Sequence, residues 1–128
     1  MPPARVLLVE DDADSREALA SLLAVGGFEV ASADCGEAAV RTFAAGRFDA
    51  VLTDLDLPDL DGWEVARRIR RLAPALPIAL ITGWTLALDA NELRLRGVDL
   101  VLTKPVDPRR IIGALQRLLQ RGGRNPSA

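Results

Sequence analysis

The sequence predicts an α/β fold, namely a five-stranded parallel sheet that is doubly wound, with helices on both faces. Five short runs rich in aliphatic and β-branched residues recur along the chain, at 6–9, 28–31, 50–53, 78–81 and 100–102. Most of them show little polar alternation, as expected for strands covered on both faces. Segments with helical spacing separate the runs, and strict alternation of strand and helix indicates βαβ units. Right-handed crossovers leave few topologies, of which we expect the strand order 2-1-3-4-5.

The first two helical segments follow the first two strands. The apolar side of the first consists of Leu19, Leu22 and Leu23. Asp14 and Glu17 are spaced as a capping box at its start, and the glycine pair 26–27 is placed to end it. Cys35 is expected to be a small residue near the start of the second helix.

The third and last helices have clearer signals than the fourth. Asp61, with Glu64 three residues on, is placed to open the third helix, and four arginines lie mostly opposite its apolar side. Asp107 as a cap and Pro108 at the first helical position predict the start of the last helix. The segment 82–97 has only a weak helical pattern.

Length and composition indicate one domain over 1–121, followed by a flexible tail or the start of a linker at 122–128. A net charge of -2 gives no electrostatic case for binding nucleic acid or an anionic membrane. With one cysteine and no histidine, an intrachain disulfide is excluded, and a zinc site or Cys-His catalysis is not expected. No secretion signal or membrane span is indicated, so we expect a cytoplasmic protein.

Carboxylates follow two strands that should be neighbours in this sheet. Glu10, Asp11 and Asp12 follow the first strand, and Asp54 and Asp56 follow the third. Unit negative charges about 5 Å apart repel by roughly 3 kcal/mol at an effective dielectric constant of about 20, so such a cluster needs a cation. Carboxylate oxygens, waters and a phosphate are the ligands that Mg²⁺ prefers. The sequence therefore predicts a magnesium site here.

A hydroxyl and an ammonium follow the remaining two strands at the same edge. The fourth strand runs into Thr82 and Gly83, and the fifth into Thr103, Lys104 and Pro105. Lys104 is the only lysine of a chain that has fifteen arginines, which suggests that a compact point charge is needed there. Together these groups suit phosphoryl transfer to a carboxylate. Asp54 would attack, Mg²⁺ would neutralise the phosphoryl oxygens, and Thr82 and Lys104 would hold the others.

Four segments resemble the motifs of receiver domains of two-component signalling, in the same order and spacing. They are VEDD at 9–12, TDLDLPDLDG at 53–62, TG at 82–83 and TKP at 103–105. The resemblance covers residues 5 to about 121. It implies the flavodoxin-like fold of that family and a signalling switch controlled by phosphorylation.

The resemblance also implies a role for each site residue. Asp54 would be the phosphoacceptor, and Asp11 and Asp54 would bind Mg²⁺. The backbone carbonyl of Asp56 would also be a ligand, and Glu10 would act through water. Lys104 would pair with the phosphoryl group, and the peptide bond between Lys104 and Pro105 would be cis.

One position departs from the family pattern. Receivers usually carry Tyr or Phe three residues before this lysine, where the ring moves on activation, and here the residue is Val101. Phosphorylation should survive this change, but the position has no ring to perform the aromatic movement of the switch. Trp84, two residues after Thr82, occupies a position that tunes access to the phosphoryl group in the family, and its bulk could slow hydrolysis.

The phosphodonor implied by the resemblance is a histidine kinase or histidine phosphotransfer protein. Because the chain has no histidine, the donor imidazole must come from another molecule or a further domain. Output would pass through a partner protein, commonly at the face of the fourth helix, fifth strand and fifth helix, or through an attached output domain. No direct contact with nucleic acid or membrane is expected, homodimerisation stays open, and the chain would be no enzyme beyond its own phosphorylation and dephosphorylation.

Alternative interpretations exist for the same residues. The segment 51–56, VLTDLD, also resembles the nucleophile motif of haloacid-dehalogenase-like phosphatases, with Asp54 as nucleophile. Those enzymes open with this strand and carry a second acidic pair late in the chain, whereas here the strand is third and the acidic pair precedes it.

Taken singly, the acidic residues 10–12 could merely favour a helix N-terminus, Thr82 could end a strand, and Lys104 could be a surface lysine. A nucleotide-binding module is not supported, since no glycine-rich phosphate loop follows any strand.

Overall fold

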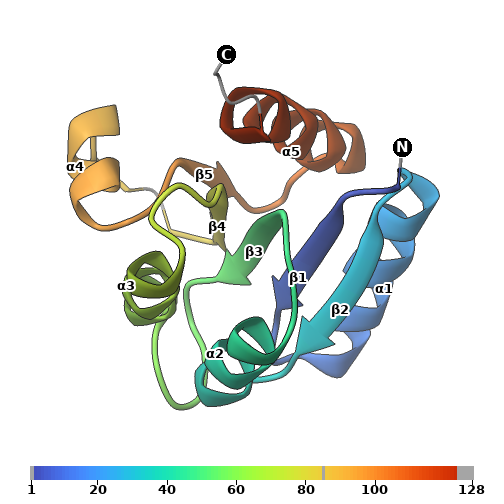
Figure 1. Ribbon diagram of the computed structural model, residues 1–128, viewed down its shortest axis with the longest axis horizontal. Coiled ribbons are helices and arrows are strands. Elements are labelled where there is room, and N and C mark those ends of the chain that lie inside the picture. Colours follow the sequence, from blue (N-terminus) through green and yellow to red (C-terminus); the bar gives the residue numbers. More distant parts are fainter. Residues whose placement is uncertain (1, 85, 124–128) are drawn as a thin grey trace.

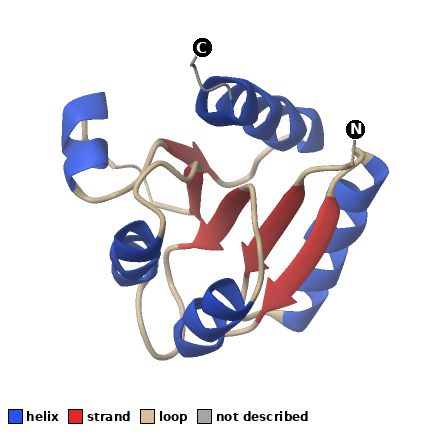
Figure 2. Ribbon diagram, viewed as in Figure 1, coloured by secondary structure: helices blue, strands red, loops and turns tan. Residues whose placement is uncertain are grey.

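The computed structural model describes residues 2–84 and 86–123, which form a twisted sheet flanked by helices (Figures 1 and 2). The strands are β1 (Arg5–Val9), β2 (Glu29–Ala33), β3 (Ala50–Asp54), β4 (Ile78–Thr82) and β5 (Leu100–Thr103). They lie in the order β2-β1-β3-β4-β5, and every pair is parallel. The predicted fold class and strand order are confirmed.

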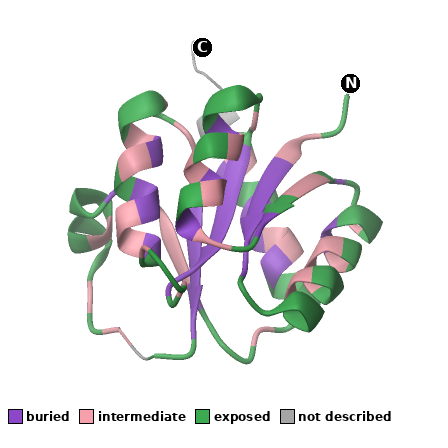
Figure 3. Cartoon of the chain, turned by 90° about the horizontal axis from the view of Figure 1, so that it is seen from below, coloured by how far each residue is buried: buried purple, intermediate pink, exposed green. Residues whose placement is uncertain are grey.

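Four helices connect these strands, and a fifth follows the last strand. They are α1 (Ala13–Val25), α2 (Gly36–Ala45), α3 (Gly62–Leu72), α4 (Ala90–Leu95) and α5 (Pro108–Gly123). One core cluster joins α1 and α5 to one face of the sheet, and a second joins α2 and α3 to the other. Residues of the central strands β1, β3 and β4 belong to both clusters, and these strands are almost entirely buried (Figure 3). None of the helices described in residues 2–84 and 86–123 is long and apolar enough to cross a membrane.

The helix starts confirm some sequence predictions and correct one. Asp61 caps α3 by accepting a hydrogen bond from the amide of Glu64, and α5 begins at Pro108, as expected. The cap of α1 is Asp12, which accepts from the amide of Ser15, so the prediction of a cap at Asp14 was wrong. Both are aspartates at the start of the same segment, and Asp12 takes the position because its backbone is extended there, as a capping residue requires.

Other boundaries also shift. The second strand is Glu29–Ala33 rather than 28–31. The weak segment contains the six-residue helix α4, whose capping box of Asp89 and Glu92 the sequence interpretation missed. Helix α5 continues to Gly123 and so includes the first two residues assigned to the tail. The rest of that tail, 124–128, lies outside the described residues.

Gly62 lies where the start of α3 approaches the end of β3. A Cβ atom at this position would lie 2.5 Å from the carbonyl oxygen of Asp54 and 2.7 Å from Cδ1 of Leu80. The amide of Gly62 also donates to the carbonyl of Leu55, at 2.8 Å, so the helix cannot easily move away. Only glycine therefore allows α3 to begin this close to the phosphoacceptor candidate.

We expect Gly62→Ala to lower the free energy of unfolding by about 1–3 kcal/mol, because the added methyl group overpacks this contact. Urea denaturation monitored by circular dichroism would measure the change. Gly113→Ala is the matched control, since the nearest atom to its Cβ would be Nη1 of Arg117 at 3.6 Å. That variant should equal the parent or gain stability. Equal stability of Gly62→Ala and the parent would contradict this interpretation of the contact.

Candidate functional site

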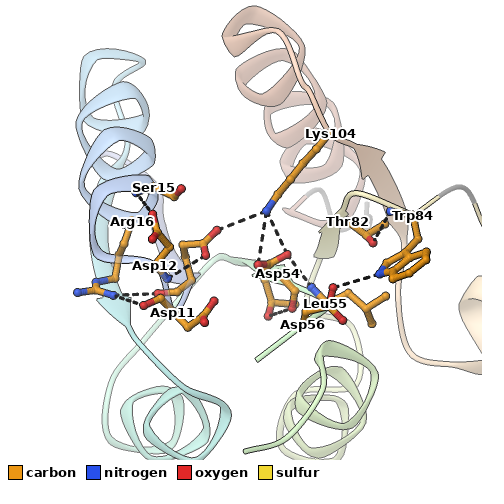
Figure 4. A network of polar contacts seen from close by, with 12 residues as sticks. Asp11, Asp12, Ser15, Arg16, Asp54, Leu55, Asp56, Thr82, Trp84 and Lys104 are labelled. Carbon is orange, nitrogen blue, oxygen red and sulfur yellow. Dashed lines mark hydrogen bonds and ion pairs between the residues drawn. The ribbon is translucent and has the colours of Figure 1, made fainter. Parts of the chain in front are cut away.

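The predicted site residues come together at the carboxyl edge of the sheet (Figure 4). Strand pairing explains this convergence. Val9 of β1 is in register with Thr53 of β3, so the residues that follow them, Glu10 and Asp54, lie side by side. In the same way, the register of Thr82 with Thr103 places Lys104 beside the end of β4. The parallel register of the central strands thus builds the site.

Three carboxylates converge at this edge. Oxygen atoms of Glu10, Asp11 and Asp54 all lie within 4.8 Å of one another. Glu10 and Asp54 are 3% and 9% exposed, whereas Asp11 faces solvent. Burial raises the pKa of both Glu10 and Asp54 above their ordinary values, against hydrogen bonds from backbone amides that lower it. Burial therefore disfavours the charged form of both carboxyls, which a bound cation would stabilise.

Lys104 supplies the positive charge nearest to this cluster among the described residues. Its Nζ lies 3.4 Å from Oδ1 of Asp54 and 3.7 Å from Oε1 of Glu10. The ammonium lowers the pKa of both carboxyls but does not outweigh their burial. The peptide bond between Lys104 and Pro105 is cis, as the resemblance implied.

Asp54 is held firmly at the end of β3. Its Oδ1 accepts a hydrogen bond from the amide of Leu55, at 3.0 Å. Its carbonyl oxygen accepts one from the hydroxyl of Thr53, at 2.9 Å. Oδ2 has only the ammonium of Lys104, at 3.5 Å, as a described hydrogen-bond partner. One oxygen thus orients the carboxylate, while the other stays open to a reactant.

Thr82 and Asp56 lie on the side of the site that faces β4. The hydroxyl of Thr82 is buried and accepts a hydrogen bond from the amide of Trp84, at 3.0 Å. The carboxylate of Asp56 is exposed and accepts from the indole Nε1 of Trp84, at 3.1 Å. Among the described residues, the side chain of Asp56 is not part of the three-carboxylate cluster, and the role implied for its backbone carbonyl stays a prediction.

Two acidic residues of the loop after β3 accept hydrogen bonds from the first amides of helices. Asp61 is the N-cap of α3, whereas Asp59 binds the first amides of a different helix, α2. Its carboxylate accepts hydrogen bonds from the amides of Gly36 and Glu37, each at 2.8 Å, and so joins the loop after β3 to the start of α2. These amides hold the pKa of Asp59 at about 2. At the start of the same helix, Cys35 is the N-cap, near the helix start as expected.

The donor set fits a hard divalent cation. All three converging groups are carboxylates, and among the described residues the carboxylate of Asp11 accepts no hydrogen bond. Mg²⁺ prefers oxygen ligands and keeps several of its waters, so it suits a partly exposed site that is lined by carboxylates. The chemistry of these ligands fits Mg²⁺ as the ion that they would hold.

The chain matches known proteins over nearly its whole length. The family model of the response regulator receiver domain matches residues 6–116. The response regulator protein FleR of Pseudomonas aeruginosa is 37% identical over 89% of the chain, which spans 24% of FleR. The response regulator receiver protein CpdR of Brucella abortus is 35% identical over 90% of the chain and 96% of its own length. Several other curated relatives are about twice as long as the matched region.

Solved structures agree with these relatives. A CheY-like response regulator receiver domain protein from Methanospirillum hungatei is 25% identical, with a TM-score of 0.87 over 94% of this chain and 97% of that one. These comparisons give no support to the phosphatase alternative. With its strand order, its acidic edge and its match over residues 6–116, the chain belongs to the response regulator receiver domain family of two-component systems.

Proposed function

We propose that this receiver domain is a signalling switch that accepts a phosphoryl group on Asp54 in a Mg²⁺-dependent reaction. The observation that carries the proposal is the convergence of Glu10, Asp11 and Asp54 beside the ammonium of Lys104. The donor would be a phosphorylated histidine kinase or phosphotransfer protein. A reducing, cytoplasmic setting is part of the proposal, since a single cysteine allows no intrachain disulfide.

The chemistry follows from the positions of these side chains. Oδ2 of Asp54 attacks the phosphorus atom, a P–O bond forms, and the bond from phosphorus to the donor nitrogen breaks. The donor imidazole leaves and takes up a proton. Bound Mg²⁺ would neutralise charge on the phosphoryl oxygens, with Asp11 and Asp54 as ligands, the carbonyl of Asp56 as another, and Glu10 acting through water. Because a carboxylate is already ionised at neutral pH, no general base is required.

Thr82 and Lys104 would hold the phosphoryl group once it is attached. The ammonium of Lys104 lies near both oxygens of Asp54, so it can follow the charge onto the new phosphoryl oxygens. The hydroxyl of Thr82 accepts from Trp84 in this structure but keeps its own proton to donate.

Incubation with a small acyl phosphate, with and without Mg²⁺, tests the proposal by intact mass. A phosphatase would instead hydrolyse phosphate esters steadily without retaining the group.

Output would reach a partner protein or an attached output domain, and Trp84 is the aromatic residue best placed to report it. Val101 packs partly buried against the second core cluster and has no ring to move. Trp84, which is 63% exposed, contacts Thr82 through its amide and Asp56 through its indole. A movement of the Thr82 hydroxyl toward a phosphoryl group would therefore displace Trp84.

We expect Mg²⁺ or the phosphoryl mimic beryllofluoride to change the tryptophan fluorescence of the parent. Trp63→Phe should keep this response, because the ring of Trp63 lies against the guanidinium of Arg96, 4.8 Å away, and not against the site. Trp84→Phe should lose it. A response that persists undiminished in Trp84→Phe and vanishes in Trp63→Phe would refute this role for Trp84.

A further inference from the structure

The loop between β1 and α1 is held by a side chain that the proposed chemistry does not use. Arg16, in the first part of α1, points back toward this loop (Figure 4). Its Nη1 donates hydrogen bonds to two backbone carbonyls, at 3.0 Å to Glu10 and 3.3 Å to Asp11. One guanidinium thus fixes two consecutive peptide groups of the loop that carries the acidic cluster.

The other polar groups of this loop are already engaged with one another. The carboxylate of Glu10 accepts from the amide of Asp12 at 3.1 Å, and the carboxylate of Asp12 accepts from the amide of Ser15 at 2.9 Å. The carboxylate of Asp11, in contrast, accepts no hydrogen bond from any described residue, although it lies within the three-carboxylate cluster. Its direction therefore depends on the backbone that carries it, and that backbone is what Arg16 holds.

The charge of Arg16 gives no reason of its own for this placement. A cation beside a site for a divalent cation opposes binding of that ion, by like-charge repulsion. A guanidinium here is therefore useful to metal binding only if the geometry that it imposes outweighs its charge. This conflict makes the sign of the effect informative, since the charge and the hydrogen bonds of Arg16 predict opposite results when the side chain is truncated.

We propose that Arg16 is a positioning residue for the metal site: it holds the backbone of Glu10 and Asp11 so that the carboxylate of Asp11 stays directed into the cluster. The inference rests on the Mg²⁺ site of the proposed function. Arg16 touches neither the metal ligand oxygens nor the phosphoacceptor, because both of its contacts in the loop are to carbonyl groups. Groups that orient metal ligands in this way commonly affect metal affinity by about ten- to a hundredfold.

Titration of the full chain with Mg²⁺ at constant ionic strength, followed through amide signals in ¹H–¹⁵N NMR spectra, tests the inference. Arg16→Met should weaken Mg²⁺ binding by roughly tenfold, because it removes both hydrogen bonds. Arg16→Lys, which keeps a donor and the charge, should recover part of the loss. Arg41→Met is the matched control, since it removes the same charge from an exposed position of α2 and should bind as the parent does.

Dispersed amide signals in the same spectra establish that each variant is folded. Mg²⁺ binding by Arg16→Met as tight as in the parent, or tighter, would overturn the positioning role while leaving the magnesium site intact. Tighter binding in particular would mean that Arg16 acts through its charge alone. A parent protein that binds no Mg²⁺ would remove the proposed metal site, and this inference with it.

Discussion

The Asp54→Asn variant should gain no phosphoryl group from a small acyl phosphate in the presence of Mg²⁺, whereas the parent gains one. An amide oxygen carries no formal negative charge and is a poor nucleophile toward phosphorus, so the expected effect is complete loss rather than a slower reaction. The other two carboxylates of the cluster do not replace Asp54. Glu10 is 3% exposed and bonded to the amide of Asp12, and Asp11 lies at the solvent side.

Intact mass spectrometry over a time course measures this loss. Asp34→Asn is the matched control, because Asp34 is an exposed aspartate that follows β2 at the same edge of the sheet and lies outside the cluster. That variant should gain the group as the parent does. Phosphoryl gain by Asp54→Asn at the rate of the parent would show that the acceptor is another residue.

Asp11→Ala and Lys104→Ala should separate metal binding from the response to phosphorylation. Asp11→Ala removes one of three converging carboxylates, so we expect Mg²⁺ affinity to fall by about ten- to a hundredfold. Lys104→Ala should not weaken Mg²⁺ binding, since it removes a positive charge that repels the ion, but it should reduce the fluorescence response to beryllofluoride. An ammonium that lies 3.4 Å from Oδ1 of Asp54 contributes to holding the phosphoryl group only once that group is present.

Mg²⁺ titration of the parent and both variants, each followed by addition of beryllofluoride, measures the two effects in one experiment. Equal Mg²⁺ affinities for the parent and Asp11→Ala would remove Asp11 from the metal site. A fluorescence response to beryllofluoride that is as large in Lys104→Ala as in the parent would rule out the proposed role of Lys104.

The fold could be predicted largely because its strands are short, aliphatic and separated by capped helices. The signal was weakest for α4, where six residues bury no side chain and therefore leave no apolar period. Its capping box of Asp89 and Glu92 is the available signal, but no apolar run follows to mark a helix. The misplaced cap of α1 has a different cause: Asp12 and Asp14 are both suitable capping residues, and only the backbone conformation distinguishes them.

The site could be located because parallel strands end at one edge, so residues that directly follow strands must meet. Contacts that depend on the direction of a long side chain could not be predicted in the same way. Arg16 reaches back over the loop, and the indole of Trp84 reaches Asp56, which lies 28 residues earlier in the chain. Asp59 accepts a hydrogen bond from the first residue of a helix that begins 23 residues before it, a contact that no local pattern predicts.

Asp54 should take up a phosphoryl group in a Mg²⁺-dependent reaction, and locating that group on the parent chain tests this role most directly. The protein would be incubated with a small acyl phosphate, with and without Mg²⁺, digested, and mapped by peptide mass. We predict a single phosphoryl group on the peptide that contains Asp54, present only with Mg²⁺ and released by hydroxylamine, as an acyl phosphate is. A group on any other peptide, one that resists hydroxylamine, or equal uptake without Mg²⁺ would contradict the account.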